Sequence, residues 1–439
     1  MLISRKSVFG KGLFAATAPA SLWLLAQACG GTTADTPAQQ DAGSDAAEAP
    51  DAAETPDANV PDTSNVVSPI YPAKHAPMPL VDNNGGRVIH NPKIVTITWA
   101  NDDPTMVARL RQFDDTITGT AWWTAVASEY CEKGNNAPCI GKGSSGGHVV
   151  ITDPLPMGGF TDSSQGGAST IQDFIKAHLA SDPTFPQPTP DTIYSIYLPD
   201  GVAIDLDGSQ GCTNGGFGAY HSTVDLVPGD GGLVTTAYSV TPRCGTDEAT
   251  TTVSASHEYI EAATDPDIGQ NNLTYYMLNQ TWAFAGGEVG DLCVDFVGGN
   301  DKLTQDGFVI QRSWSNASAK AGHNPCVPVP SGEVYFQAAP RVQHVILKKV
   351  GDSAVVDVDA YSDAPIADWA LSAVDFGQFQ GGGTNLSFSF DQTTVNNGYH
   401  VQLTVKLTKA LAQGATAFAV VSKGGKQQNY FWPVLVTQK

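Results

Sequence analysis

Hydrophobic positions between residues 93 and 264 alternate between the period of a strand and the period of a helix. Short β-branched and aromatic runs predict strands, and apolar residues recurring every three or four positions predict helices. The expected strands are Lys93–Trp99, 149–151, Ile193–Leu198, 218–222 and 233–240. The expected helices are Pro104–Ala127, Ser169–Leu179 and Thr250–Thr264. This order favours a mixed α+β main domain, to which we assign residues 67–330.

The pattern changes near Pro330, where the helical period stops and alternation with period two begins. The expected strands are 342–347, 354–358, 386–390, 401–405 and 418–422, separated by turn residues such as Asn396-Asn397-Gly398. Short alternating strands of this kind are typical of an antiparallel β-sandwich. Residues 331–439 are therefore expected to form an all-β sandwich domain.

The first 29 residues have the pattern of an export signal. Arg5, Lys6 and Lys11 precede an apolar, Ala-rich stretch, and the small residues of Ala26-Gln27-Ala28 stand before Cys29. A basic start, a short apolar core and a small-x-small site predict a removed signal rather than a membrane span. A small residue followed by Cys also resembles a bacterial lipobox, so Cys29 is a candidate lipidation site, with plain cleavage after Ala28 as the alternative.

Composition supports a tether after this signal. Residues 30–66 hold eight acids, no base and few large side chains, so they are expected to form a disordered acidic linker. The whole chain of 439 residues has 23 Lys and Arg against 44 Asp and Glu, a formal charge of −21. Such acidity argues against nucleic acid as a partner, because phosphate binding requires a basic face. We expect an outer-membrane or cell-surface lipoprotein, or a secreted protein if Cys29 is not lipidated, with extracellular protein, peptide or glycan as partner.

The cysteine count agrees with export. Apart from Cys29 there are six cysteines, and an exported chain meets an oxidising compartment, so three disulfides are expected. Fifteen pairings are open to six cysteines. We favour pairing between neighbours, which gives Cys131–Cys139, Cys212–Cys244 and Cys293–Cys326.

The helix expected at Thr250–Thr264 carries the clearest chemical pattern. His257 and Glu261 are four residues apart and share one helix face, where an imidazole and a carboxylate can hold one Zn²⁺. Glu258 stands beside His257, as the general base does in the metallopeptidase pattern H-E-x-x-H. Here the pattern is H-E-x-x-E, so the second ligand would be a carboxylate.

A third ligand is expected downstream of this helix. Glu288 is the favoured residue, with Asp291 orienting the first His or serving as an alternative ligand. Asp265 and Asp267 follow the helix directly and are rivals for the third position. His221 is a further candidate, as an extra ligand or an oxyanion stabiliser, although an ordinary core or surface histidine is the simpler interpretation.

A set of residues in the same order resembles the EXORDIUM-like, or phosphate-induced protein, family and related zincin-like secreted bacterial proteins. The matching residues are Thr98-Trp99, Trp122-Trp123 with Tyr130, 193–199, 218–222, Ser256-His257-Glu258 with Glu261-Ala262, Trp282, 288–293, 312–316 and Cys326. The resemblance implies a zincin-like α+β main domain. Plant members of the family are cell-wall proteins linked to growth.

Two functions therefore stand side by side. The first is an exported, membrane-anchored, zinc-dependent metallopeptidase that acts on extracellular protein or peptide, with His257, Glu261 and Glu288 as ligands and Glu258 as base. The alternative is a non-catalytic surface adhesin or glycan-binding protein built on a zincin-like scaffold. Metal content distinguishes the two.

Overall fold

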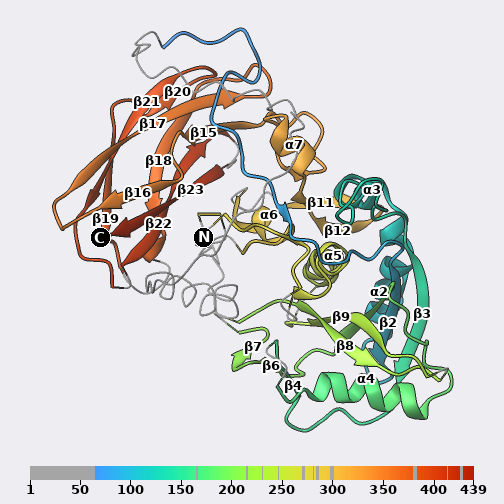
Figure 1. Ribbon diagram of the computed structural model, residues 1–439. Coiled ribbons are helices and arrows are strands. Elements are labelled where there is room, and N and C mark those ends of the chain that lie inside the picture. Colours follow the sequence, from blue (N-terminus) through green and yellow to red (C-terminus); the bar gives the residue numbers. More distant parts are fainter. Residues whose placement is uncertain are drawn as a thin grey trace, which may run out of the picture.

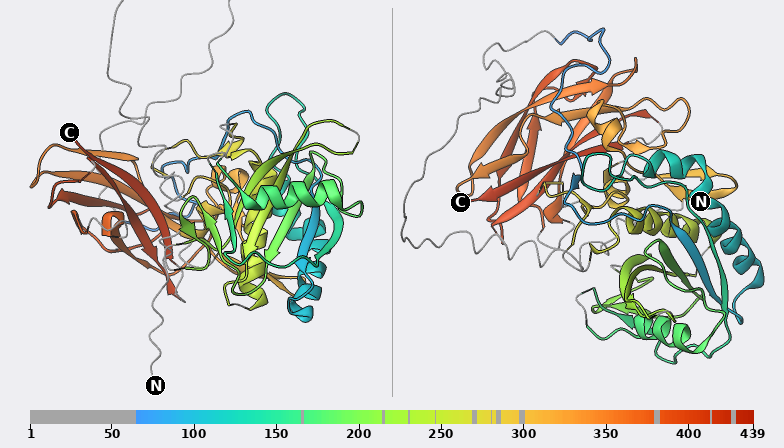
Figure 2. Two further views of the ribbon diagram at one scale, coloured as in Figure 1. Left: turned by 90° about the horizontal axis from the view of Figure 1, so that it is seen from below. Right: turned by 45° about the vertical axis from the view of Figure 1, so that its right-hand side comes forward.

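The computed structural model describes residues 65–439, except 165–166, 214–215, 230, 246, 269–271, 280, 283–285, 297–300, 379–382, 413 and 426–428. The expected signal with Cys29, and the expected linker up to residue 64, lie outside the described residues. The described chain forms an α+β region and a β-rich C-terminal region, which lie side by side in all views (Figures 1 and 2). The α+β class and the β-rich C-terminal region are thus confirmed.

A five-stranded mixed sheet organises the α+β region. Its strand order is β3-β2-β5-β9-β8, with every neighbouring pair parallel except β9 and β8, which are antiparallel. The strands are β2 (Lys93–Trp99), β3 (Ser144–Ile151), β5 (Thr192–Leu198), β8 (Tyr220–Leu226) and β9 (Val234–Pro242). All seven residues of the central strand β5 are buried, as expected for an apolar run in a sheet covered on both faces. β8 is an edge strand, and this position matters for the site below.

The long helix expected from Pro104 to Ala127 is wrong in extent. The structure divides it into α2 (Pro104–Thr116), a 3₁₀ turn η1 (Ile117–Gly119) and α3 (Ala121–Ala127). The break has a local cause, because the Thr120 side chain accepts a hydrogen bond from the Trp123 backbone N–H and so begins a new helix. The second helix, α4 (Thr170–Ser181), agrees with its prediction and is capped by Ser169.

Helix α5 (Glu248–Thr264) corresponds to the predicted helix at Thr250–Thr264 and is the best-buried helix of the described chain. Asp247 caps it by accepting from the Thr250 N–H, and Asp265 follows its last residue. Residues on every side of its second half are buried, including His257, Glu258 and Glu261. α5 packs between the sheet and the hairpin of β11 (Lys302–Gln305) and β12 (Phe308–Gln311) (Figure 1). A helix that buries charged residues needs polar partners on the surfaces around it.

The smaller elements connect these layers. They are β1 (Asp82–Asn83), β4 (Phe160–Asp162), β6 (Ile204–Leu206), β7 (Ser209–Gln210), β10 (Tyr275–Tyr276), α6 (Asp291–Phe296), β13 (Ser313–Trp314), α7 (Asn316–Lys320) and β14 (Cys326–Val327). β1 pairs with β10 and β13 with β14, both antiparallel. The β10 pairing fixes the chain soon after α5, and α6 begins at Asp291 of the candidate site.

The C-terminal region consists of two sheets that pack against one another. One has the order β15-β17-β21-β19 and the other β16-β23-β22-β18-β20. The strands are β15 (Phe336–Pro340), β16 (His344–Leu347), β17 (Ser353–Ser362), β18 (Trp369–Asp375), β19 (Leu386–Phe390), β20 (Thr394–Val395), β21 (His400–Leu407), β22 (Ala415–Lys423) and β23 (Asn429–Gln438), with a 3₁₀ turn η4 (Phe376–Gln378). All pairs are antiparallel except β16 with β23, which is parallel and departs from the purely antiparallel expectation.

One hydrophobic core continues from the α+β region into the C-terminal region. The Trp282 ring contacts both Trp314 and Trp432, with ring centroids 5.6 Å and 5.4 Å apart. All three indoles are at most 1% exposed. Tyr430 and Trp432 of β23 are therefore core residues.

The three disulfides pair neighbouring cysteines, as predicted. They are Cys131–Cys139, Cys212–Cys244 and Cys293–Cys326. Disulfides of this number indicate folding in an oxidising environment. Among the described residues, no helix has the length and apolar character required to cross a bilayer.

Candidate metal centre

Three acidic or basic side chains of α5 converge beside the sheet. The Nε2 atom of His257 lies 3.0 Å from Oε2 of Glu261, one helical turn further on, and 4.0 Å from Oε1 of Glu258. The three residues are between 2% and 9% exposed. The helix spacing thus brings together the pair that the sequence predicts as metal ligands, and Glu258 lies next to them.

The loop before α6 closes over Glu261. The backbone N–H groups of Gly290 and Asp291 both donate to Oε1 of Glu261, at 3.1 and 2.9 Å. Oε1 is thereby occupied, and the second oxygen, Oε2, faces the imidazoles. This approach requires glycine, because a Cβ at Gly290 would lie 2.7 Å from Oε1 of Glu261 and 2.9 Å from Nδ1 of His257.

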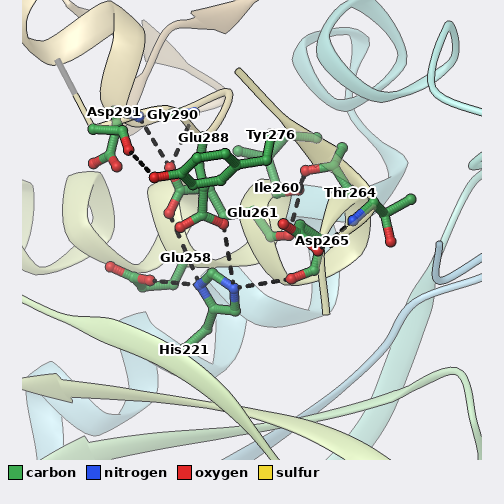
Figure 3. A network of polar contacts seen from close by, with 12 residues as sticks. His221, Glu258, Ile260, Glu261, Thr264, Asp265, Tyr276, Glu288, Gly290 and Asp291 are labelled. Carbon is green, nitrogen blue, oxygen red and sulfur yellow. Dashed lines mark hydrogen bonds and ion pairs between the residues drawn. The ribbon is translucent and has the colours of Figure 1, made fainter. Parts of the chain in front are cut away.

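Strand β8 supplies a second imidazole from the opposite side (Figure 3). His221 Nδ1 lies 3.2 Å from Oε2 of Glu258 and 3.9 Å from Oε2 of Glu261. Its Nε2 lies 3.3 Å from the carbonyl oxygen of Asp265 and 3.6 Å from Oε1 of Glu288. His221 therefore belongs to the centre of the cluster, a more central place than its sequence-based ranking gave it.

Gln311, at the end of β12, holds the ring of His257. Its Oε1 atom lies 3.0 Å from Nδ1 of His257, and its Nε2 donates to the carbonyl of Gly290 at 2.9 Å. Since the second bond directs the amide oxygen toward the ring, Nδ1 of His257 donates its hydrogen to Gln311, and Nε2 is left to face Oε2 of Glu261. Sequence reasoning missed Gln311, which is 54 residues from His257 and belongs to no motif.

The cluster contains far more acid than base. Five carboxylates gather around two imidazoles, and each of the seven residues is at most 9% exposed; the acids are Glu258, Glu261, Asp265, Glu288 and Asp291. Within the described part of the chain, the two histidines are the only basic side chains at ion-pair distance from Glu258, Glu261 and Glu288. Buried charge of one sign is costly unless a counter-charge accompanies it.

The pKa values of these side chains shift in the directions that this excess of acid predicts. Burial opposes charge on His257, yet the Glu261 and Glu258 carboxylates outweigh burial and raise the pKa of His257 well above its ordinary value. Burial also opposes charge on His221, and its hydrogen bond with Glu258 reverses this, so the pKa of His221 is raised. Burial and repulsion from Glu261 hold the pKa of Glu288 well above that of an ordinary glutamate. Burial raises the pKa of Asp265 to about 7.

Two groups of three residues place ligand atoms within 4.8 Å of one another: His257, Glu258 and Glu261, and then His221, Glu261 and Glu288. Glu261 is common to both. The sequence-predicted set of His257, Glu261 and Glu288 is thus divided between two neighbouring groups, because Glu288 faces His221. Asp291 lies 3.5 Å from Nε2 of His257 through Oδ1.

The two rivals for the third ligand have different surroundings. Asp267 forms a two-pronged ion pair with Arg87, at 3.0 Å for each oxygen, so its carboxylate is already neutralised. Asp265 accepts from the Thr274 N–H through Oδ1 and turns its backbone carbonyl toward His221. Among the described residues, no hydrogen-bond donor reaches Oδ2 of Asp265 or Oε1 of Glu288.

These residues fit a divalent cation. Imidazole nitrogen with carboxylate oxygen is a donor set that zinc accepts, and a ligating histidine commonly donates its other N–H to a carbonyl or carboxylate. Gln311 provides that partner for His257, and Glu258 provides it for His221. Oε1 of Glu288, which no donor among the described residues reaches, is available to a cation as well.

No known protein family matches the chain, and no curated protein matches it. The solved structures that match include a xyloglucanase from Bacteroides ovatus in complex with a heptasaccharide, at 12% identity and a TM-score of 0.17. They also include a FixG-related protein from Vibrio parahaemolyticus, at 8% and 0.18, and the BIgI domain of beta protein from S. agalactiae bound to CEACAM1, at 14% and 0.17. Each match covers 24% of this chain, and covers 19%, 96% and 97% of the respective structures. A likeness of this extent establishes neither the fold nor the activity of this chain.

Proposed function

We propose that this chain is an exported, metal-dependent peptidase whose centre is built on His257, Glu258 and Glu261. One observation carries the proposal: five buried carboxylates converge on two imidazoles. Such an arrangement is costly in a purely structural core, since ionised carboxylates gathered away from water repel one another unless a counter-charge accompanies them. A divalent cation supplies the missing positive charge.

The ligand roles follow from which atoms are already occupied. Nε2 of His257 and Oε2 of Glu261 face one another at 3.0 Å, and their partner atoms are held by Gln311 and by two backbone amides. Zn²⁺ held by these residues would supply Lewis acidity and would make a bound water more acidic. Glu288, the third ligand expected from the sequence, has a ligand atom within 4.8 Å of Glu261 and His221.

We propose Glu258 as the residue that transfers protons. Adjacent helix positions project about 100° apart, so Glu258 reaches the site without occupying the ligand position of His257. In our proposal its carboxylate takes the proton from the attacking water and returns it to the leaving amine. The hydrogen bond with His221 directs Oε2 of Glu258 into the centre.

The edge strand β8 supports a peptide as substrate. β8 carries His221 and lies at the open end of the sheet order, with β9 as its only strand partner in the described sheet. An edge strand can pair with an extended peptide through main-chain hydrogen bonds. A chain bound in this way would run beside His221.

Metal content and hydrolysis, measured on the full chain, test the proposal. Wild type should bind Zn²⁺ and cleave a casein-type substrate. Glu258→Gln should keep zinc and lose hydrolysis, whereas Glu261→Ala should lose zinc. Glu132→Gln, a half-exposed glutamate paired with His90, is the matched control and should behave as wild type. A wild type that binds no zinc under metal-replete conditions would refute the proposal and favour the non-catalytic adhesin.

The location is part of the same proposal. The three disulfides indicate an oxidising compartment, and we propose in addition a lipid anchor at Cys29. Cys29→Ala should move the protein from the membrane fraction to the soluble fraction. If the variant stays in the membrane fraction, Cys29 is not the anchor.

A further inference from the structure

We propose that the centre holds two divalent cations, with Glu261 between them and the second cation bound by His221, Glu288 and the carbonyl of Asp265. This inference rests on the proposed metal centre and deepens it. It does not depend on the substrate. Four independent features of the cluster lead to it.

The first feature is the surroundings of the His221 ring. Nδ1 lies 3.2 Å from Oε2 of Glu258, which can only accept when ionised, so Nδ1 carries the hydrogen of that bond. In the neutral ring Nε2 then presents a lone pair. It faces the Asp265 carbonyl at 3.3 Å and Oε1 of Glu288 at 3.6 Å, both of them acceptors. Three acceptors converge on one point, which requires a proton or a cation between them.

The second feature is the unpartnered Glu288 carboxylate. Its side chain is 10% exposed, and no donor among the described residues reaches Oε1. This is the oxygen directed at His221. A buried carboxylate oxygen without a donor loses the hydrogen bonds that water would make to it. A bound cation compensates for this loss of hydration.

The third feature is the separation of the imidazoles. Each belongs to a different group of ligand atoms within 4.8 Å, and no group in the described chain contains both. Two ligands of one zinc ion lie at most about 4 Å apart, twice the zinc–nitrogen bond length. One ion therefore does not bind both imidazoles at their present positions. Glu261 belongs to both groups, as a bridging carboxylate does.

The fourth feature is the charge. When all five carboxylates are ionised and both imidazoles are neutral, one divalent cation leaves a surplus of three negative charges, and a second cation reduces the surplus to one. Paired cations bridged by a carboxylate are a known catalytic arrangement, which can hold both the attacking and the leaving groups of a hydrolysis. The rival arrangement is a single cation beside a protonated His221.

Stoichiometry distinguishes the two arrangements without any activity assay. Metal-free full-length protein is titrated with Zn²⁺, desalted, and analysed for zinc per chain by mass spectrometry. Wild type should bind two ions. His221→Ala and the isosteric Glu288→Gln should each bind one, and Glu261→Ala should bind fewer than one. His148→Ala, a partly exposed histidine paired with Asp115, is the control and should bind two.

A second readout checks proximity. Loaded with Mn²⁺ alone, wild type should give the exchange-coupled spectrum of a manganese pair in electron paramagnetic resonance, and Glu288→Gln should give the spectrum of isolated ions. One zinc per chain in wild type, unchanged in Glu288→Gln, would overturn the second site while leaving the proposed centre intact. No zinc in wild type would overturn the proposed centre itself.

Discussion

Removing the amide of Gln311 should weaken metal binding although Gln311 is not itself a ligand. The side chain is 3% exposed and makes two bonds, one to Nδ1 of His257 and one to the carbonyl of Gly290. Loss of a group that orients a ligating histidine typically costs 10- to 100-fold in affinity, or about 1.4 to 2.8 kcal/mol. Gln311→Ala also removes one donor to the Gly290 carbonyl, which still accepts from the Cys293 N–H at 3.0 Å. We therefore expect a loss within this range, at least about tenfold.

The assay is a zinc competition titration of full-length protein against a chromophoric chelator, together with urea unfolding of the metal-free protein. Gln311→Glu keeps an acceptor for Nδ1 of His257 and should retain more affinity than Gln311→Ala. The matched control is Gln337→Ala. That glutamine is fully buried in the C-terminal region, where it accepts from the Ser422 hydroxyl at 2.9 Å. The Gln337→Ala variant should lose stability and keep the zinc affinity of wild type.

The comparison can fail in a clear way. If Gln311→Ala loses stability as the control does and still binds zinc as wild type does, then Gln311 contributes to the packing of the core and not to metal binding. Equal losses of affinity in Gln311→Ala and Gln337→Ala would also refute the reasoning, because the effect would then reflect general destabilisation.

Three further outcomes are expected. Gly290→Ala should lower zinc affinity at least tenfold, because its Cβ would come 2.7 Å from Oε1 of Glu261; equilibrium dialysis measures this. Burial raises the pKa of Asp114 from 3.8 to about 7, so the folded state binds this proton more tightly than the unfolded state does. The contribution of Asp114 to the stability of metal-free protein should therefore fall as pH rises from about 4 to about 7, so the pH slope of wild type in urea unfolding should lie below that of Asp114→Asn by up to about 1.4 kcal/mol per pH unit. The double variant Cys293→Ala/Cys326→Ala removes a link across 33 residues and should lose about 4 kcal/mol of unfolding free energy in urea, whereas an unchanged unfolding midpoint would mean that the link constrains nothing.

Local patterns predicted those parts of the centre that lie on one element. His257 and Glu261 are one helical turn apart, so their contact follows from helix geometry alone. The helix end at Thr264 was also predictable, since Pro266 follows it closely. Pairing each cysteine with the next one along the chain predicted the disulfides correctly, because the two cysteines of each pair are separated by only 8, 32 or 33 residues.

Contacts between distant elements were not predictable in this way. His221 reaches the centre only because β8 returns antiparallel beside β9 and takes the edge of the sheet. Gln311 reaches it only because β12 packs on α5, where its N–H donates to the hydroxyl of Ser256 at 3.0 Å. Neither residue stands in a spacing that marks a ligand. The same limit explains why Glu288 was assigned to His257, while the fold directs it to His221.

The C-terminal region has a physical connection with the centre that the motif alone does not show. The segment that supplies Glu288 and Gly290 is rich in glycine, and Gly286 and Gly287 have positive φ, so it has little conformational preference of its own. The conformation of this segment must therefore be fixed by contacts with neighbouring elements. The backbone N–H of Trp314 donates to the Val289 carbonyl at 2.8 Å. The ring of Trp282 contacts the rings of both Trp314 and Trp432 of β23. The sheet that contains β23 thus packs behind the segment 286–290 and helps to hold Glu288 opposite His221. The β-rich region therefore supports the candidate metal centre, whether or not it binds a partner of its own.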